Sequence, residues 1–368
     1  MINDTNQIQT AGDNAQQIQG QNVTIINQIG ITEQRAREID AELYAIAKRD
    51  FSYEAEQKID ERVRKLEDRV IPRLSRIEGA LQNFADPSFQ VFLTKANKAA
   101  ACTDRELDYD LISELLVHRV QKKDSQKDKL GITKAVEIVD QITETSLSGL
   151  TVFYAVSQWE PIADELERGL TLLNKLYGSL PIQNLPYNQD WLDELDILDA
   201  LRMSSISTLK KLEDYWEERF SGFVAVGIKK NGENWDVVEK KLESVNLSTS
   251  DLVDNVLIEG YLLLPVIYKN KIEKLVYQTS VDGKMVKSPI SEDQKKVFYD
   301  IFEMYDRSNE LKQKVKKAFV EKIDSYENLK IVRQWWNSIP HALNVTSVGR
   351  ILAHINAKRC EPSLPDLN

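Results

Sequence analysis

The three histidines, His118, His341 and His354, are the first residues to examine for chemistry. Nucleophilic catalysis needs a serine or cysteine beside a histidine base with an orienting acid. A zinc site needs His, Cys or carboxylate partners one helical turn away or close by on a turn. None of the three lies beside a cysteine or in a glycine-rich turn, and "HRV" and "HIN" offer single ligands only. The sequence therefore predicts no catalytic residue, no metal ligand and no cofactor, and it favours a protein that is not an enzyme.

Two short motifs approach nuclease patterns. Arg350 and His354 resemble the Arg–His pair of HEPN-type RNases, but fewer residues separate them than in that family. Glu239-Lys240-Lys241 has the letters of the Glu-x-Lys motif of restriction-type nucleases, which holds Mg²⁺ from a strand. Here the motif lies in a predicted helix, one turn from Asp236, and a salt-bridged helix face explains it. A metal-dependent nuclease-like effector with a dispersed active site stays as the alternative function.

The elements that would position such residues are predicted to be mainly helices. The 368 residues include only 14 Gly and 10 Pro, with 42% hydrophobic and 29% charged residues, which is typical of a soluble helical protein. We expect long N-terminal helices, a helical bundle, a small mixed α/β module and a short β-prone N-terminal repeat. The predicted domains are 1–30, a Gln/Asn-rich self-association segment; 31–128, long helices; 129–222, a helical bundle; 223–290, the α/β module; and 291–368, a C-terminal helical domain.

A long amphipathic stripe follows the predicted N-cap Thr32. Apolar residues recur at steps of three and four from Ala36 to Leu81, which predicts one long helix bent at Pro72. The stripe fits packing inside one chain or an intermolecular coiled coil. Gly79 falls inside this predicted helix.

Capping signals predict further helix starts. Asp86-Pro87 pairs an N-cap with proline at the first helical position. Thr103-x-x-Glu106 and Ser291-x-x-Gln294 have the spacing of capping boxes. The remaining predicted helices include about 161–176, one long helix over 190–219, and one from 291 to about 326.

Outside the N-terminal segment, strand signals lie in the α/β module. "FVAVGI" (223–228) leans to strand, and Asp282-Gly283 between two β-prone runs is a strong hairpin signal.

The net charge and the cysteine content limit which partners and which cellular location are expected. A net charge of −10 argues against a general nucleic-acid binder. Cys102 and Cys360 match no metal or redox spacing, no run is long enough to span a membrane, and no signal peptide begins the chain, so a cytoplasmic protein is expected. A lysine group stands out near the C-terminus, and it is either a solvated helix face or a contact with phosphate or an acidic partner. This group comprises Lys312, Lys314, Lys316 and Lys317.

The N-terminal segment repeats itself at a spacing of eight residues. Residues 9–15, "QTAGDNA", align with 17–23, "QIQGQNV", and the strand-prone "VTII" follows. Glycine and asparagine tolerate the left-handed corners of short stacked β-coils, and copies from other chains would pair the exposed edges. We therefore predict a self-association segment, with a disordered Gln/Asn-rich tail as the alternative. The residues assigned to self-association are Gly12, Asn14, Gln17, Ile18, Gly20, Asn22, Val23 and Ile25.

Two family resemblances follow from quoted motifs. "QIQG" within "GDNAQQIQGQNVTI" resembles the amyloid-signalling motifs of bacterial and fungal immune proteins, although Gln19 stands where an apolar residue is usual. "DPSFQ" (86–90), "ISELLVHRV" (112–120) and "LNVTSVGR" (343–350) resemble the bacterial abortive-infection alpha (Abi-alpha) proteins, and "ITEQRAREI" (31–39) is similar to other defence-associated chains. The second resemblance implies a role in anti-phage defence and supplies no catalytic residues.

The expected function is thus a self-associating interaction protein, which forms homo-oligomers through residues 1–30 and has a further, unidentified protein partner. A structural scaffold unrelated to defence is a third reading, beside the nuclease alternative.

Overall fold

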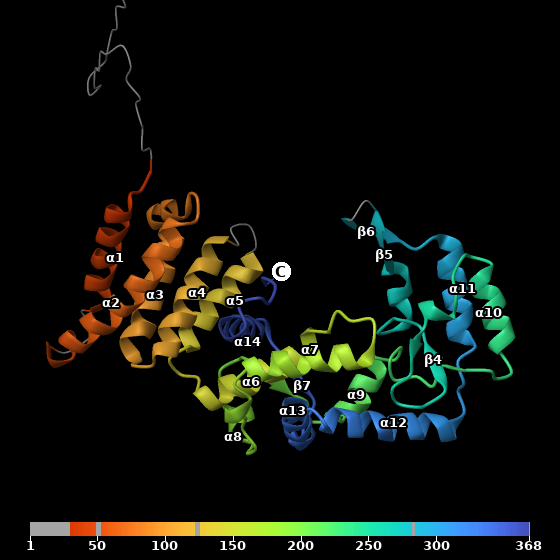
Figure 1. Ribbon diagram of the computed structural model, residues 1–368. Coiled ribbons are helices and arrows are strands. Elements are labelled where there is room, and N and C mark those ends of the chain that lie inside the picture. Colours follow the sequence, from red (N-terminus) through yellow and green to blue (C-terminus); the bar gives the residue numbers. More distant parts are fainter. Residues whose placement is uncertain (1–29, 49–52, 122–125, 282–283, 368) are drawn as a thin grey trace, which may run out of the picture.

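A computed structural model describes residues 30–48, 53–121, 126–281 and 284–367. Helices dominate it, as the sequence predicts, and the few strands are short. Figure 1 shows an elongated arrangement in which the N-terminal helices and α14 form one end and the β-containing part forms the other. None of the helices in the described chain combines the length and apolar character that crossing a bilayer requires.

The N-terminal apolar stripe forms two antiparallel helices and not one long helix. The helices are α1 (Glu33–Lys48) and α2 (Tyr53–Ser75). Arg37 pairs with Glu67, and Tyr44 donates a hydrogen bond to Asp60, which fixes the antiparallel direction. The prediction of a single helix was wrong because periodicity identifies the buried face but does not show whether the chain reverses between two halves of it.

The stripe itself is confirmed as a buried face. Ala36 and Ile39 of α1 and Leu66 and Leu74 of α2 are buried in the first hydrophobic core. The stripe ends earlier than predicted, because α2 stops at Ser75 and Gly79 takes a left-handed φ of 70° before the 3₁₀ turn η1 (Ala80–Ala85).

Three helices complete the N-terminal end of the molecule. They are α3 (Pro87–Cys102), α4 (Glu106–Gln121) and α5 (Gln126–Ile138). The Asp86 carboxylate accepts from the amide of Phe89 at 3.0 Å, which confirms the predicted N-cap of α3. The predicted capping box at Thr103 does not form. The Thr103 hydroxyl accepts from Arg105 and donates to Asp108, and the Glu106 carboxylate instead bonds the cations of α2.

Two helices predicted in the middle of the chain, over 161–176 and 190–219, differ from the helices that the structure contains. Those present are α6 (Glu144–Gln158), α7 (Leu166–Ser179), the 3₁₀ turn η2 (Ile182–Asn184), α8 (Asp190–Ile197) and α9 (Leu212–Arg219). The helix predicted from 161 begins at Leu166. The helix predicted over 190–219 is broken at Asp199, whose φ is 58°, and strand β1 (Leu201–Met203) follows. β1 pairs antiparallel with β7 (Leu343–Val345), so the partner that breaks this helix lies far along the chain.

The second core lies in the β-containing end. Its elements are β2 (Ile228–Lys229), α10 (Trp235–Glu243), the turn η3 (Thr249–Asp251), β3 (Val253–Asp254), β4 (Tyr261–Leu263), the turn η4 (Lys269–Lys274) and α11 (Glu292–Glu303). The sheet order is β2-β4-β3, and each pair is antiparallel. Of the strand predicted over 223–228, only Ile228 at its end is in a strand.

The predicted hairpin and the second capping box are both present. Strands β5 (Val276–Val281) and β6 (Lys284–Pro289) pair antiparallel on either side of the predicted turn, whose residues 282–283 lie outside the described residues. Ser291 and Gln294 form the capping box of α11. The helix predicted from 291 to about 326 is two helices, because the Asp306 side chain accepts from the amide of Ser308 in a turn between them.

The C-terminal helices return to the first core. They are α12 (Asn309–Asp324), α13 (Glu327–Ser338) and α14 (Ser347–Cys360). α14 packs against α4, α5 and α6, and Asn356 donates to the Thr151 hydroxyl in the interior. The first core thus joins residues from both ends of the chain, whereas the five-domain division stays a prediction.

Candidate functional site

The residues assigned to self-association, 12–25, lie outside the described residues. The nearest part of the described structure is the entry of the chain into the fold at 30–32. The amide of Ile31 donates to Oε1 of Gln82 at 3.1 Å, and the Ile31 side chain packs against the first core. The Thr32 hydroxyl accepts from the amide of Arg35 at 3.2 Å, which confirms Thr32 as the N-cap of α1. The point from which residues 1–29 extend is therefore fixed to the body.

Helix α1 is docked on α3 through a buried polar pair. Nδ2 of Asn97 donates to Oδ1 of Asp40 at 2.8 Å, and Asp40 is 4% exposed. Burial raises the pKa of Asp40 to about 6, with a further contribution from the nearby Glu67 carboxylate; the hydrogen bond from Asn97 and the charge of Arg37 act in the opposite direction. Since a buried carboxylate with one hydrogen bond is costly when ionised, this contact makes the docking of α1 depend on pH.

Charged side chains add to the docking of α1 on α2. Arg37 bonds Glu67 at 2.6 Å and Glu33 at 3.0 Å. Lys48 lies 3.3 Å from Asp60 at the other end of the hairpin. These partly exposed pairs set the register of the two helices, and the buried apolar face supplies most of the stability.

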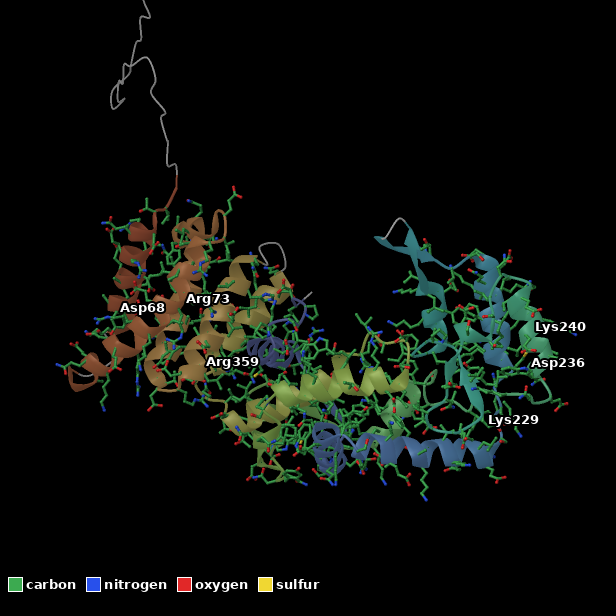
Figure 2. All side chains as sticks on the ribbon, in the orientation of Figure 1. Asp68, Arg73, Lys229, Asp236, Lys240 and Arg359 are labelled. Atoms are coloured by element: carbon green, nitrogen blue, oxygen red, sulfur yellow. The ribbon has the colours of Figure 1, made fainter. Side chains whose placement is uncertain are left out.

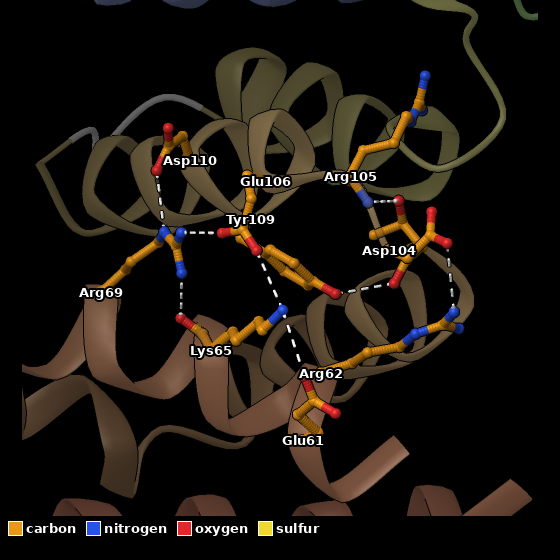
Figure 3. Close-up of polar contacts among 10 residues, drawn as sticks. Glu61, Arg62, Lys65, Arg69, Asp104, Arg105, Glu106, Tyr109 and Asp110 are labelled. Carbon is orange, nitrogen blue, oxygen red and sulfur yellow. Dashed lines mark hydrogen bonds and ion pairs between the residues drawn. The ribbon is translucent and has the colours of Figure 1, made fainter. Parts of the chain in front are cut away.

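A ladder of ion pairs joins α2 to α4 (Figure 3). Arg69 contacts both Glu106 and Asp110, and Lys65 lies 3.0 Å from Glu106. Hydrogen bonds from Lys65 and Arg69 lower the pKa of Glu106. Arg73 continues the ladder to Glu114 at 2.6 Å. Because cations and carboxylates here satisfy one another, the ladder is an assembly of structural contacts that holds α2 against α4.

The structure does not bring the predicted lysine group onto one surface. Lys316 turns toward α9 and bonds Asp214 at 2.5 Å and Glu217 at 3.0 Å. Lys312, Lys314 and Lys317 are exposed on α12. At 100° per residue, Lys314 and Lys317 project from a different side of the helix than Lys312 and Lys316. The contact with phosphate or an acidic partner stays a prediction, and the geometry gives it no convergent site.

The near-nuclease pair on α14 is not arranged for catalysis. His354 is 4% exposed, and its Nδ1 lies 3.2 Å from the Tyr154 hydroxyl. Burial, followed by the charge of Lys358, lowers the pKa of His354 to about 4. Arg350 is exposed to solvent. His354 is thus buried and neutral, whereas Arg350 faces solvent, so the two side chains do not share one site.

Glu239-Lys240-Lys241 lies on α10, where the sequence predicts a helix. Lys241 bonds Asp300 of α11 at 2.6 Å, so the ion pair crosses between helices and does not run along one helix face as predicted. Figure 2 shows Asp236 and Lys240 at the outer edge of the β-containing end. Among the described residues, no group of three His, Cys, Asp or Glu side chains is placed to hold a metal ion.

The comparisons with known proteins bear on the whole described body. A protein-family model whose description reads only ":-like" matches residues 30–367. The chain belongs to that family. No curated protein and no solved structure matches it. The match covers the helical body, and residues 1–29 lie outside it.

Sequence reasoning missed the Asp40–Asn97 contact. A signal for it was present, because Asp40 follows Ala36 by four residues and so lies on the apolar stripe. A carboxylate at such a position is either buried with a hydrogen-bond partner or exposed where the stripe is interrupted. Asp40 is buried, and its partner is Asn97.

Proposed function

We propose that this protein is a self-associating interaction protein, in which residues 1–30 join copies of the chain and the helical body is carried on that assembly. The observation that carries the proposal is the repeat of "QTAGDNA" as "QIQGQNV" immediately before an anchored helix. A repeat of two units is too short to bury a core alone, and further units from other chains would complete it.

Two features of the body support this role. Ile31 and Thr32 tie the start of the body to η1 and α1, so an assembly of the N-terminal segments would hold each body at a defined point. The family match covers residues 30–367, so the repeat precedes the part of the chain that the family model describes. This arrangement is typical of an association element added to an independent domain.

The test is the molar mass of the purified chain by size-exclusion chromatography with light scattering, at about micromolar concentration. The full chain is expected to exceed the mass of a monomer, and a chain that begins at Gly30 is expected to be monomeric with an unchanged circular dichroism spectrum. Gly20→Val should disperse the assembly, because a β-branched residue at a left-handed corner costs about 1–3 kcal/mol per chain.

Thr5→Val is the matched control, since it introduces the same side chain in the same segment outside the repeat. It should assemble as the unaltered chain does. A monomeric full-length chain, or equal masses for Gly20→Val and Thr5→Val, would refute the self-association proposal.

We further propose that the assembly acts in anti-phage defence. This rests on the resemblance of "DPSFQ", "ISELLVHRV" and "LNVTSVGR" to the Abi-alpha proteins. Plaque counts on a host with and without the gene test it directly. Equal counts across a panel of phages would favour the scaffold reading, and metal-dependent cleavage of nucleic acid by the purified chain would favour the nuclease alternative.

A further inference from the structure

A cavity of about 390 Å³ lies where α2, α4 and α14 meet the C-terminal segment 361–367. Its polar lining includes Arg73, His118, His354, Lys358, Arg359 and Asp366. Figure 2 labels Arg73 and Arg359, which lie in the same half of the molecule, far from Asp236 and Lys240. The volume falls within the range of sites for small molecules.

The lining carries more positive than negative charge. Arg73 is neutralised by Glu114 at 2.6 Å, and Lys358 by Asp366. Arg359 has no carboxylate partner among the described residues. Its Nε and one Nη each lie 3.2 Å from the neutral Oδ1 of Asn356. One guanidinium is thus available to an anion that enters the cavity.

His354 supplies a buried polar atom to the same lining. Its Nδ1 faces the Tyr154 hydroxyl, and its Nε2 is enclosed without a hydrogen bond of ordinary geometry in the described chain, although the carbonyl of Pro365 lies nearby. When the Tyr154 hydroxyl donates to Nδ1, the proton of the neutral ring is on Nε2. That N–H then faces the carbonyl of Pro365, which is the acceptor oxygen nearest to it in the C-terminal segment.

The Asp366 carboxylate already occupies the position of an anion beside Lys358. It is 87% exposed, and exposed ion pairs contribute little stability. The carboxylate or phosphate of a ligand can therefore replace Asp366 at Lys358 with little loss to the fold.

We propose that this cavity binds a small organic oxyanion, held by Arg359 and Lys358 at its charged group, and that Asp366 occupies the Lys358 position when no ligand is bound. The apolar part of the ligand would contact Val117 and Ile355, which line the cavity beside the cations. The proposal is independent of self-association, because the cavity lies in the body and involves no residue of the N-terminal segment.

Isothermal titration calorimetry of the full chain at about 50 mM salt tests the proposal, with AMP as the phosphate probe and citrate as the carboxylate probe. Saturable binding of either probe is expected, and the probe that binds identifies the anionic group. Asp366→Asn should tighten binding by at least about threefold, because it frees Lys358. Arg359→Gln should weaken it by about tenfold or more, as expected for the loss of a charge-assisted hydrogen bond.

Arg168→Gln is the matched control, since Arg168 is an exposed arginine of α7 whose ion pair is with Asp164. It should bind as the unaltered chain does, and circular dichroism should show that all three variants fold. Absence of saturable binding of both probes to the unaltered chain and to Asp366→Asn would overturn the proposal. Equal affinities for Arg359→Gln and Arg168→Gln would do so as well.

Discussion

Replacing Asp40 with asparagine should remove a pH dependence that the buried carboxylate gives to the fold. In the folded chain the pKa of Asp40 is about 6, against an ordinary value of 3.8. Well below pH 3.8 the carboxyl is protonated in both the folded and the unfolded chain, and its stabilising contribution is fully present. That contribution is lost as the pH rises through about 6, because the folded state must then bury a charge.

The size of the effect follows from the shift. About two pKa units, at about 1.4 kcal/mol per unit, correspond to about 3 kcal/mol of unfolding free energy lost between about pH 3 and pH 7.5. Asparagine keeps an oxygen that can accept from Asn97 and carries no charge. The stability advantage of the Asp40→Asn chain over the unaltered chain should therefore be about 2 kcal/mol larger at pH 7.5 than at pH 4.5.

Urea denaturation followed by circular dichroism, at pH values from 4.5 to 8, measures this difference. Asp68→Asn is the matched control, because Asp68 lies on the exposed side of α2 (Figure 2). Its free energy should stay within about 0.5 kcal/mol of the unaltered chain. A gap between Asp40→Asn and the unaltered chain that is the same at every pH would refute the reasoning, since the cost of burying the Asp40 charge would then be absent.

Two further predictions concern packing, and both are measured by urea denaturation at one pH. Leu66→Ala should lower the unfolding free energy by about 2–5 kcal/mol, since Leu66 is 1% exposed, whereas Asp68→Ala should change it by less than about 0.5 kcal/mol; similar losses would contradict the assignment of the buried face. Gly349→Ala should cost more than Gly79→Ala, because a Cβ at 349 would collide with the carbonyl of Ala200, whereas a Cβ at 79 meets no atom and only the left-handed φ opposes it. If Gly79→Ala lowers the unfolding free energy more than Gly349→Ala does, the backbone conformation at Gly79 matters more than the close approach of α14 to Ala200.

Local signals in the sequence predicted local structure well. The N-cap Asp86, the capping box of Ser291 and Gln294, and the buried face that includes Leu66 all depend on contacts within one or two helical turns, and all are present. The Thr103 capping box failed because Glu106 has stronger partners in Lys65 and Arg69 of another helix.

Several of the errors share one physical cause, which is pairing with distant parts of the chain. Residues 190–219 contain no strong break, yet β1 forms there because β7 lies alongside it. The reversal between α1 and α2 likewise depends on α3, against which both helices bury their apolar faces. The oxyanion cavity is formed by the ends of three helices and the C-terminal segment, so no spacing in the sequence could indicate it.

The motifs that resemble the Abi-alpha proteins have structural roles in this chain. Asp86 of "DPSFQ" caps α3, and Thr346 of "LNVTSVGR" caps α14, with its hydroxyl accepting from the amide of Gly349 at 3.2 Å. Gly349 in turn lets α14 approach the backbone of Ala200. A resemblance at residues that cap helices or allow close packing indicates a shared fold. It does not by itself indicate a shared activity. The defence proposal therefore needs the plaque assay as its own test, and a positive molar-mass result for residues 1–30 would establish assembly without establishing what the assembly does.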